Sequence, residues 1–384
     1  MTALATSLGP TPRIEIRTDL IEHNTRVLVR RLAHRNITIA GITKATLGSV
    51  GVARAMLRGG VTSLGESRVE NIETLRAAGI TAPIMLIRSP MLSQTERVVA
   101  SANVSCNTEL DVVRALSHAA VLQQRNHGVL VMIELGDLRE GVLANHLEEF
   151  VEAISQLANI TLMGIGTNLA CQHGVAPDET NMAELSTLAE SIEPFASDPL
   201  TIVSGGNSAN LNWITATDSV GRVNHLRLGE AILLGREPLD RTPIDGLNLD
   251  AFTLVGEVIE SQCKPQHPWG HRHQSTFGSP MPSPSTPTAT TSGTASDAAQ
   301  GTTHAPDARP RTIVALGHQD IDPTGITSRN GHAIIGASSD HLMIDTGING
   351  LAIGAELRFD LNYAALLRAM TSPFVAKVYD AHSH

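Results

Sequence analysis

A lysine ends the first strongly apolar stretch of the sequence, ITIAGITK, where Lys44 follows a run of β-branched and small residues. Burying an ammonium group is unfavourable unless the group is neutralised or bonded to a partner. Lys44 can extend its aliphatic stem until the charge reaches solvent. Alternatively, a partly desolvated lysine with a lowered pKa can attack an aldehyde and form a Schiff base. The position of Lys44 alone leaves both interpretations open.

Small and polar residues follow two apolar stretches further along the chain, at Ser204–Ser208 (SGGNS) and Arg227–Glu230 (RLGE). Backbone N–H groups of glycines together with a serine hydroxyl can bind a phosphate. The same glycines can equally form tight turns. Arg139, Thr167 and Asn168 are further polar residues at the ends of apolar stretches. The types of these residues are compatible with a phosphate-bearing ligand.

The elements that position these residues follow a regular alternation between Arg13 and about Gly235 of short β-branched runs and longer amphipathic stretches. Such alternation predicts parallel strands joined by helices. Eight strands are expected, at Thr38–Lys44, Val61–Gly65, Pro83–Arg88, Asn103–Asn107, Gly128–Leu135, Ile160–Thr167, Leu200–Ser204 and Val223–Leu228. Eight repeats favour closure into a (β/α)8 TIM barrel, here over 13–240. Reactive groups then lie at the carboxyl ends of strands, and phosphate binds after the seventh and eighth.

The pattern changes after Asn248. Strands without intervening helices are expected at Phe252–Ile259, Thr312–Leu316, Ala333–Ile335, Leu342–Asp345 and Phe374–Val378, which predicts a C-terminal antiparallel β domain over 248–380. Within it, Gly278–Pro310 is rich in Ser, Thr, Pro, Ala and Gly. Such a composition buries too little apolar surface to offset the entropy of ordering, so we expect a disordered, low-complexity insertion over 279–308.

The composition excludes several classes of protein. The chain has 384 residues, of which 42% are hydrophobic and 17% charged, as in a folded globular protein. A net charge of −10 argues against nucleic-acid or anionic-membrane surfaces. The three cysteines lie far apart, so neither a disulfide framework nor a metal site is expected. Neither a secretory signal nor an apolar run of about 18 residues is found, and the expected location is the cytoplasm.

Six motifs carry a resemblance to a known family. ITKAT, ELGDLREGV, GIGTNLACQ, SGGNSANL, HLRLGEAILLG and GASSDHLMID occur in this order, at spacings similar to those of the alanine/ornithine racemase family. The resemblance covers almost the whole chain except Gly278–Pro310. It implies a pyridoxal-phosphate (PLP) barrel followed by a β domain. It further implies a racemase of a free amino acid, ornithine or alanine foremost, that works by two-base α-proton transfer as a homodimer with composite active sites.

The resemblance assigns the two central roles to Lys44 and Arg227. Lys44 matches the lysine that bears the cofactor and acts as one of the two bases. Arg227 matches an arginine that faces the pyridine nitrogen of the cofactor. Because an arginine does not give up its proton, the ring nitrogen stays largely unprotonated. A weaker electron sink then favours racemisation over transamination or elimination. The alternative role of Arg227 is a salt bridge at the barrel mouth.

The remaining cofactor-binding residues are also implied by the matching motifs. Asn207, Ser208, Gly229 and Glu230 match the phosphate-binding segments, with Glu230 acting through its backbone N–H because its carboxylate would repel a phosphate. Asn168 matches a position against the cofactor ring. Arg139 matches one near the cofactor's phenolic oxygen or the substrate carboxylate. Asn168 and Arg139 can instead be structural caps at strand ends.

The sequence departs from the alanine racemases at two places. Gly48 stands where they have a phosphate-binding tyrosine. Phe277 stands where their second base, also a tyrosine, would lie, and a phenylalanine transfers no proton. The second base must then come from another group, for which the candidates are His318, Asp320, Asp340 and His341. Histidine suits proton transfer near neutral pH. Each candidate can instead be a hydrogen-bonding support. Residues 338–340 match the segment that reaches the partner subunit's site in relatives.

Three other functions compete with racemisation. A non-catalytic PLP-binding homeostasis protein would end near the eighth strand, whereas this chain continues. A decarboxylase of the same fold uses a cysteine of the β domain, where Cys263 is the only one and lies outside the polar motifs. A D-amino-acid aldolase needs a divalent metal, and the pair Asp340–His341 leaves that alternative open. The substrate is not specified by the sequence.

Overall fold

The computed structural model describes residues 9–265 and 308–380. The chain divides into two compact units, each described by itself below. One comprises Ile16–Phe252 together with 379–380, and the other comprises 9–15 together with Thr253–Val378. The expected insertion at 279–308 and the substituted position Phe277 fall almost entirely outside the described residues, which resume at Ala308.

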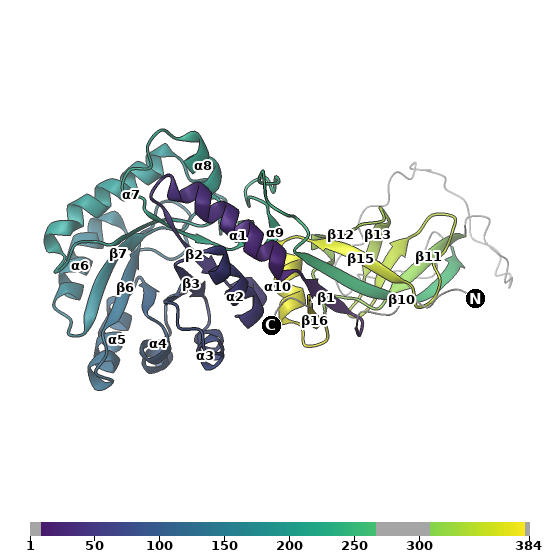
Figure 1. The fold of residues 1–384 in the computed structure, drawn as a ribbon, viewed down its shortest axis with the longest axis horizontal. Coiled ribbons are helices and arrows are strands. Elements are labelled where there is room, and N and C mark those ends of the chain that lie inside the picture. The colour runs from purple at the N-terminus through teal and green to yellow at the C-terminus, as the bar shows by residue number, and fades with distance from the viewer. Residues whose placement is uncertain (1–8, 266–307, 381–384) are drawn as a thin grey trace, which may run out of the picture. The chain divides into compact units, whose positions relative to one another are not determined.

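The first unit is a closed barrel of parallel strands (Figure 1). The strands are β2 (Thr38–Ile42), β3 (Ser63–Glu66), β4 (Ile84–Leu86), β5 (Val104–Asn107), β6 (His127–Met132), β7 (Ile160–Gly166), β8 (Ile202–Gly206) and β9 (His225–Leu228). Each strand pairs with the next, and β9 pairs with β2 to close the ring. The predicted (β/α)8 barrel is therefore confirmed. Lys44 lies just past β2 rather than in it, because Thr43 (ψ 0°) ends the extended backbone.

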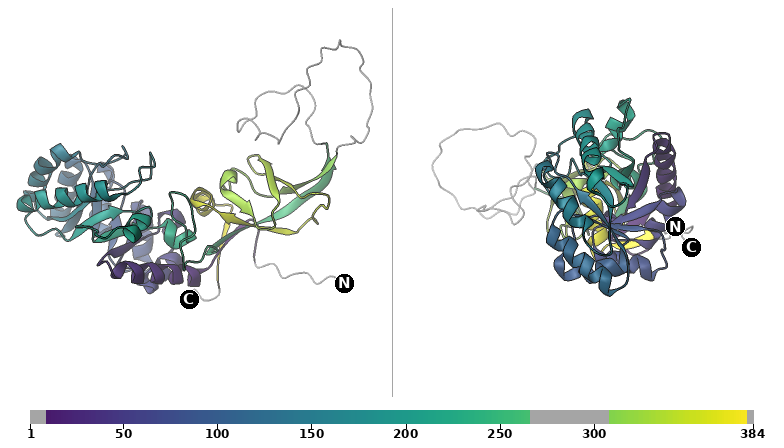
Figure 2. Two further views of the ribbon diagram at one scale, coloured as in Figure 1. Left: turned by 90° about the horizontal axis from the view of Figure 1, so that it is seen from above. Right: turned by 90° about the vertical axis from the view of Figure 1, so that its left-hand side faces the viewer.

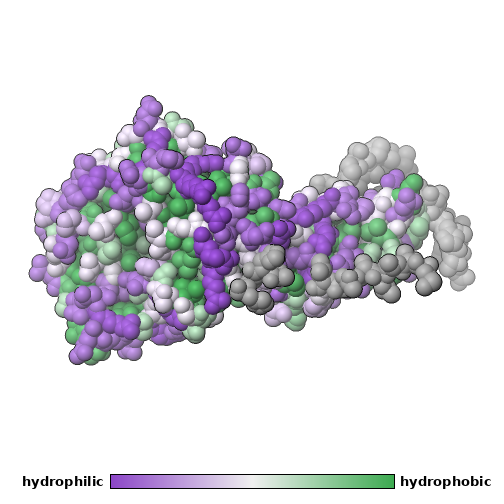
Figure 3. Space-filling view, in the orientation of Figure 1, coloured by the Kyte–Doolittle hydropathy of each residue, from purple (hydrophilic) through white to green (hydrophobic). Residues whose placement is uncertain are grey.

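Helices surround the barrel strands (Figure 2, right). They are α1 (Thr18–Ala33), α2 (Val50–Gly59), α3 (Val69–Ala77), α4 (Thr95–Ser101), α5 (Leu110–Leu122), α6 (Leu147–Ser155), α7 (Glu179–Ile192), α8 (Asn210–Ala216) and α9 (Glu230–Leu234). In α1 the buried residues Ile21, Leu28 and Leu32 recur at helical spacing and form one apolar face. The outer face of α1 is strongly hydrophilic (Figure 3).

The interior of the barrel is packed with side chains. Met85, Cys106, Leu130 and Met132 form one buried cluster from three neighbouring strands. Ser105 and Asn107, which alternate with Cys106, point to the other face of β5 because strand side chains alternate in direction. There Ser105 Oγ lies 2.8 Å from His127 Nε2. A filled interior confines ligand chemistry to the ends of the strands.

The second unit is built on antiparallel strand pairs, as predicted. Its strands are β1 (Arg13–Ile16), β10 (Phe252–Lys264), β11 (Arg309–Val314), β12 (Ile326–Ser328), β13 (Ala333–Ala337), β14 (Leu342–Asp345), β15 (Glu356–Leu361) and β16 (Ala376–Tyr379). The order is β12-β15-β10-β11-β14-β13, and β1 pairs with both β10 and β16. The expectation of strands without helices is wrong in one place. Helix α10 (Tyr363–Thr371) follows β15, capped by Asn362, whose side chain accepts from the Ala365 N–H.

Candidate active site

Lys44 occupies the carboxyl end of β2, where it opens a short 3-10 turn (Lys44–Thr46). The turn is held by the Thr43 carbonyl, which accepts from the backbone N–H and the hydroxyl of Thr46, both at 3.0 Å. Burial lowers the pKa of Lys44, and the nearby Arg139 and Arg227 cations lower it further. Cys171 and Glu66 act in the opposite direction. The turn therefore presents a partly desolvated amine with enhanced nucleophilic character.

Arg227, in β9, is a buried cation bonded to neutral groups. Its Nη1 donates to Ser204 Oγ, and its Nη2 donates to the Thr167 carbonyl at 2.6 Å. The side chain is 5% exposed, and burial lowers its pKa. A guanidinium has five N–H donors, and within the described residues these two hydrogen bonds are the ones that it makes. The group is thus able to donate to a ligand acceptor, such as a ring nitrogen.

Ser204 and His225 extend this arrangement, and the sequence analysis assigned neither of them a role. His225 Nδ1 lies 3.0 Å from Ser204 Oγ, which also accepts from Arg227. Burial, together with the Arg227 charge, lowers the pKa of His225 to about 3, so the imidazole is neutral at physiological pH. A usable signal was that His225 lies two residues before Arg227 in β9, so their side chains point to the same face of the strand, which pairs with β8 at Ser204.

The expected phosphate-binding residues lie at the ends of β8 and β9. Ser208 is buried, and its Oγ accepts from the Ala231 N–H at 3.2 Å. Ala231 belongs to α9, which begins directly after Gly229. Asn207 Nδ2 donates to the Leu169 carbonyl at 2.8 Å and to Asn168 Oδ1 at 3.2 Å. The structure therefore brings Ser208 next to the start of α9 and uses the Asn207 side chain to tie the loops after β7 and β8 together.

Glu230 differs from the other phosphate-site candidates because it carries a carboxyl group. Burial raises its pKa, whereas the charges of Arg241 and Lys44 oppose that shift. Its side chain is half-buried. Glu230 is the first residue of α9, so its backbone N–H lies at the start of that helix. This is compatible with the expected use of the Glu230 backbone N–H.

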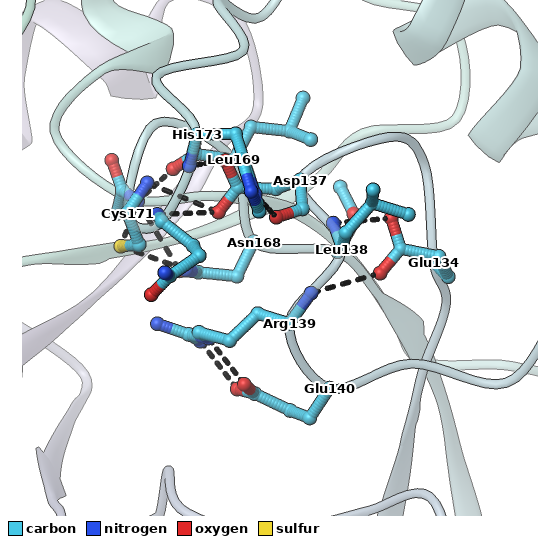
Figure 4. A network of polar contacts seen from close by, with 12 residues as sticks. Glu134, Asp137, Leu138, Arg139, Glu140, Asn168, Leu169, Cys171 and His173 are labelled. Atoms are coloured by element: carbon cyan, nitrogen blue, oxygen red, sulfur yellow. Dashed lines mark hydrogen bonds and ion pairs between the residues drawn. The ribbon is translucent and has the colours of Figure 1, made fainter.

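Arg139 and Asn168 belong to a polar network that joins the loops after β6 and β7 (Figure 4). Arg139 forms a two-pronged ion pair with Glu140, and its side chain is 33% exposed. Burial acts to lower the pKa of Arg139, but the pairing with Glu140 outweighs it and the net shift is upward. Asn168 Nδ2 donates to Cys171 Sγ at 2.9 Å. Both side chains stand at the barrel mouth with partners of their own.

Asp137 anchors the loop that follows β7. Its carboxylate accepts from three successive backbone N–H groups, those of Cys171, Gln172 and His173, at 3.2, 2.9 and 3.0 Å. These hydrogen bonds lower the pKa of Asp137 against the effect of burial. Figure 4 shows the resulting compact arrangement around Cys171. Cys171 was treated in the sequence analysis only as a cysteine without a partner, yet it lies among the groups that act on Lys44.

The proposed second-base candidates lie in the other unit. His341 Nδ1 is 2.8 Å from Asp340 Oδ1; the His341 side chain is half-buried and that of Asp340 is exposed. The His318 N–H donates to the Ser338 carbonyl at 3.0 Å. His318 therefore lies beside the loop that carries Asp340 and His341. Asp320 accepts from the Gly317 N–H at 3.0 Å, and burial raises its pKa. The four candidates therefore lie on two neighbouring loops of this unit.

The comparisons with known proteins agree with this arrangement. Residues 16–237 match the family described as alanine racemase, N-terminal domain. The chain is 36% identical over 371 residues to a lysine racemase of Thermotoga maritima, which covers 96% of this chain and 98% of that protein. It is 32% identical over 370 residues to an ornithine racemase of Acetoanaerobium sticklandii, covering 95% and 99%. The chain belongs to the alanine racemase N-terminal domain family.

Solved structures support the fold. Alanine racemase from a D-cycloserine-producing Streptomyces lavendulae aligns with a TM-score of 0.73 at 19% identity, over 98% of this chain and 100% of that one. Alanine racemase from Streptomyces coelicolor A3(2) also aligns with a TM-score of 0.73, at 18% identity, over 96% and 98%. Together with the full-length relatives, these findings identify an amino-acid racemase and favour it over the aldolase, decarboxylase and non-catalytic alternatives.

Two further features bear on the sequence expectations. Among the helices of the described residues, none is long and apolar enough to cross a membrane. Within the same residues, His, Cys, Asp and Glu side chains do not gather in groups of three or more that could hold a metal ion.

Proposed function

We propose that this chain is a PLP-dependent racemase of a diamino acid, lysine or ornithine, with the cofactor carried on Lys44. The observation that carries the proposal is the pairing, at one barrel mouth, of a lysine whose pKa burial lowers with a buried arginine whose partners are neutral. A lysine of this kind reacts with an aldehyde. Arg227 offers donors to an unprotonated ring nitrogen.

The remaining groups fit the same cofactor. Ser208 Oγ contacts the start of α9, which follows Gly229, at the ends of β8 and β9, where barrels of this class bind phosphate. Asn168 would lie against the ring, held by Asn207 and Cys171. Arg139 would serve the phenolic oxygen or the substrate carboxylate. Bound PLP supplies electron withdrawal that lets the α-proton of an amino acid leave.

The residues of the chain would then control the proton and its direction. Lys44 Nζ takes or returns the α-proton on one face of the α-carbon. A second group must serve the opposite face, because a single base would have to carry the proton around the molecule. We assign this role to His318 or His341, with Asp340 and Asp320 as the alternatives. In a homodimer with composite sites, the partner subunit would supply that group. Arg227, as a permanent cation, keeps the ring nitrogen unprotonated and disfavours transamination.

The substrate proposal rests on the lengths of the matches. The lysine and ornithine racemases match this chain over nearly its whole length. By contrast, alanine racemase 2 of Caldanaerobacter subterraneus subsp. tengcongensis matches at 32% identity over 162 residues, 41% of this chain. The β unit, which is outside residues 16–237 of the family match, thus resembles the diamino-acid enzymes.

Two measurements test the proposal. Borohydride reduction of the holoprotein should fix the cofactor on Lys44, as read by peptide mass spectrometry. Incubation in D2O should exchange the α-proton of lysine or ornithine at least tenfold faster than that of alanine. Label on another lysine, or on none, would overturn the role of Lys44. Faster exchange with alanine would overturn the substrate class and leave the racemase assignment standing.

A further inference from the structure

Glu66 is a fully buried carboxyl group next to the lysine, and the proposed reaction gives it no role. It is the last residue of β3 and is 0% exposed. The strands β2 and β3 pair with Ile42 opposite Gly65, so Glu66 lies level with Thr43, the residue before Lys44. A buried acidic residue needs partners to offset the loss of hydration.

Hydroxyl, amide and backbone N–H groups surround the Glu66 carboxyl group. Thr43 Oγ1 lies 2.9 Å from Oε2, and the Ser67 N–H lies 2.7 Å from Oε1. Asn71 and the Arg68 N–H add further bonds. Burial raises the pKa of Glu66, and these donors oppose that effect. The Ser67 and Arg68 N–H groups can only donate, so they favour the carboxylate form, whereas the Thr43 hydroxyl can donate or accept.

This carboxylate fixes the backbone that carries Lys44. The Thr43 hydroxyl is held by Glu66, and the Thr43 N–H donates to the Gly65 carbonyl at 3.0 Å. The Thr43 carbonyl accepts from Thr46 and from the Gly48 N–H, the latter at 3.3 Å. Thr43 is therefore bonded through its side chain, its N–H and its carbonyl. The orientation of the next residue, Lys44, follows from these three attachments.

Glu66 also balances charge around the lysine. The groups that act on Lys44 come from several elements: Arg139 after β6, Cys171 after β7, Arg227 in β9, Glu230 in α9 and Glu66 in β3. Two of these are permanent cations. Glu66 is the carboxyl group among them that is fully buried and surrounded by donors, so its charge is screened least by water.

We propose that Glu66 is a positioning residue for Lys44, one that anchors Thr43 and supplies a buried negative charge that acts on Lys44 in opposition to Arg139 and Arg227. The inference rests on the proposed role of Lys44. Removing the charge, as in Glu66→Gln, leaves the effect of the two arginines on Lys44 less opposed. The protonated form of Lys44 is then less stable, and the amine becomes reactive at lower pH. For unit charges several ångströms apart at an effective dielectric constant of about 20, the expected shift is roughly one pH unit.

The test measures the titration of Lys44 directly. The full-length chain, prepared without cofactor, is labelled with a trace of acetic anhydride across pH 6–11, and modification is quantified by peptide mass spectrometry. The chain has three lysines, so Lys264 and Lys377 serve as internal references. Glu66→Gln should lower the midpoint for Lys44 by roughly one unit and leave the reference lysines unchanged. Thr43→Val, which keeps the charge, should leave the midpoint in place while kcat falls.

Glu237→Gln is the matched control. Glu237 is also a buried barrel glutamate, 1% exposed, and accepts from the N–H groups of Leu239, Asp240 and Thr242. It is not among the charges that act on Lys44. An unchanged midpoint in folded Glu66→Gln, or an equal shift in Glu237→Gln, would overturn the proposal. If Glu66→Gln does not fold, Glu66→Asp replaces it: the charge is kept, the midpoint should stay, and a fall of a full unit would contradict the charge role. Since no cofactor is present, the shift is observable even if borohydride labels nothing.

Discussion

The two units each bury an arginine, and they treat it in opposite ways. Arg13 of the β unit is 0% exposed and donates to two carboxylates, to Glu356 at 2.7 and 2.8 Å and to Glu15 at 2.8 and 3.0 Å. The pairing with Glu356, more than any other contact, raises the pKa of Arg13. Arg227 of the barrel donates to a hydroxyl and a carbonyl, and burial lowers its pKa. A buried ion with full pairing serves the fold, whereas one without a counter-charge points to a ligand.

The same contrast applies to lysine and gives the largest expected effect. Burial lowers the pKa of both Lys44 in the barrel and Lys377 in the β unit, where Lys377 Nζ donates to the Ser372 carbonyl. If Lys44 carries the cofactor and moves a proton, as proposed, Lys44→Ala should reduce racemisation in both directions by about 10⁴-fold or more. Lys377→Ala should retain wild-type kcat. The rates are read by polarimetry. Substantial activity in Lys44→Ala would place the chemistry elsewhere.

Replacing each arginine by leucine separates folding from function. Arg13→Leu leaves Glu15 and Glu356 without their shared partner and should lower the free energy of unfolding by about 3–5 kcal/mol. Arg227→Leu leaves no carboxylate behind, so stability without cofactor should change by less than about 1.5 kcal/mol, while racemisation falls and transamination of the cofactor rises. Urea unfolding and product analysis give both values. A comparable loss of stability in the two variants would remove the distinction between the sites.

The histidines of the β unit provide the next test. If His318 or His341 is the second base, His318→Asn or His341→Asn should slow interconversion by about 10²-fold or more and leave α-proton exchange of one enantiomer. Exchange of L and D substrate in D2O is compared for each variant. Near wild-type racemisation in both would turn attention to Asp320 and Asp340. Mixing Lys44→Ala with the inactive histidine variant should restore one working site per mixed dimer only if the partner supplies the base.

The smallest effect concerns acid stability. The barrel buries His127 and His225, whereas the described histidines of the β unit, His318, His332 and His341, are half-buried. Burial lowers the pKa of His127 to about 4. In the unfolded chain the His127 imidazole binds a proton below about pH 6.5, whereas in the folded protein it does so only below about pH 4. His127 therefore destabilises the fold as pH falls from about 6.5 to about 4.

Burial raises the pKa values of Glu66 and Glu230, and a raised carboxyl pKa makes folding more favourable as pH falls. The contribution of His127 is therefore measured as the difference between wild type and a His127 variant. Between pH 7 and pH 5, wild type should lose about 2 kcal/mol more than His127→Gln. The exposed His118→Gln serves as the control. Urea unfolding at both values of pH gives the difference. An equal pH dependence in wild type and His127→Gln would show that His127 is protonated without penalty.

Much of the fold was predictable because each barrel strand is a short β-branched run followed by an amphipathic stretch. The helix α10 was missed because its sequence, YAALLRAMT, is separated from the strand ELRFDL by one residue, Asn362, with no glycine or proline between them. Lys44 and Arg227 were singled out from the ends of predicted strands together with the family motifs, and their roles stay predictions. Glu66 also ends a strand, but nothing in VTSLGE shows that its carboxyl group turns toward Thr43 of the neighbouring strand. The partners of Arg227 depend on the register of β7, β8 and β9, which only the folded barrel specifies.

The pairing of β1 with β10 and β16 has a consequence for synthesis. The first described strand of the chain, Arg13–Ile16, pairs with two strands that begin at Phe252 and Ala376. During translation the barrel can therefore form while β1 has no partner, and the sheet can be completed only when the last strand has emerged from the ribosome. A chain that stops before Ala376 would leave an unpaired strand edge exposed, which is a template for association with other chains.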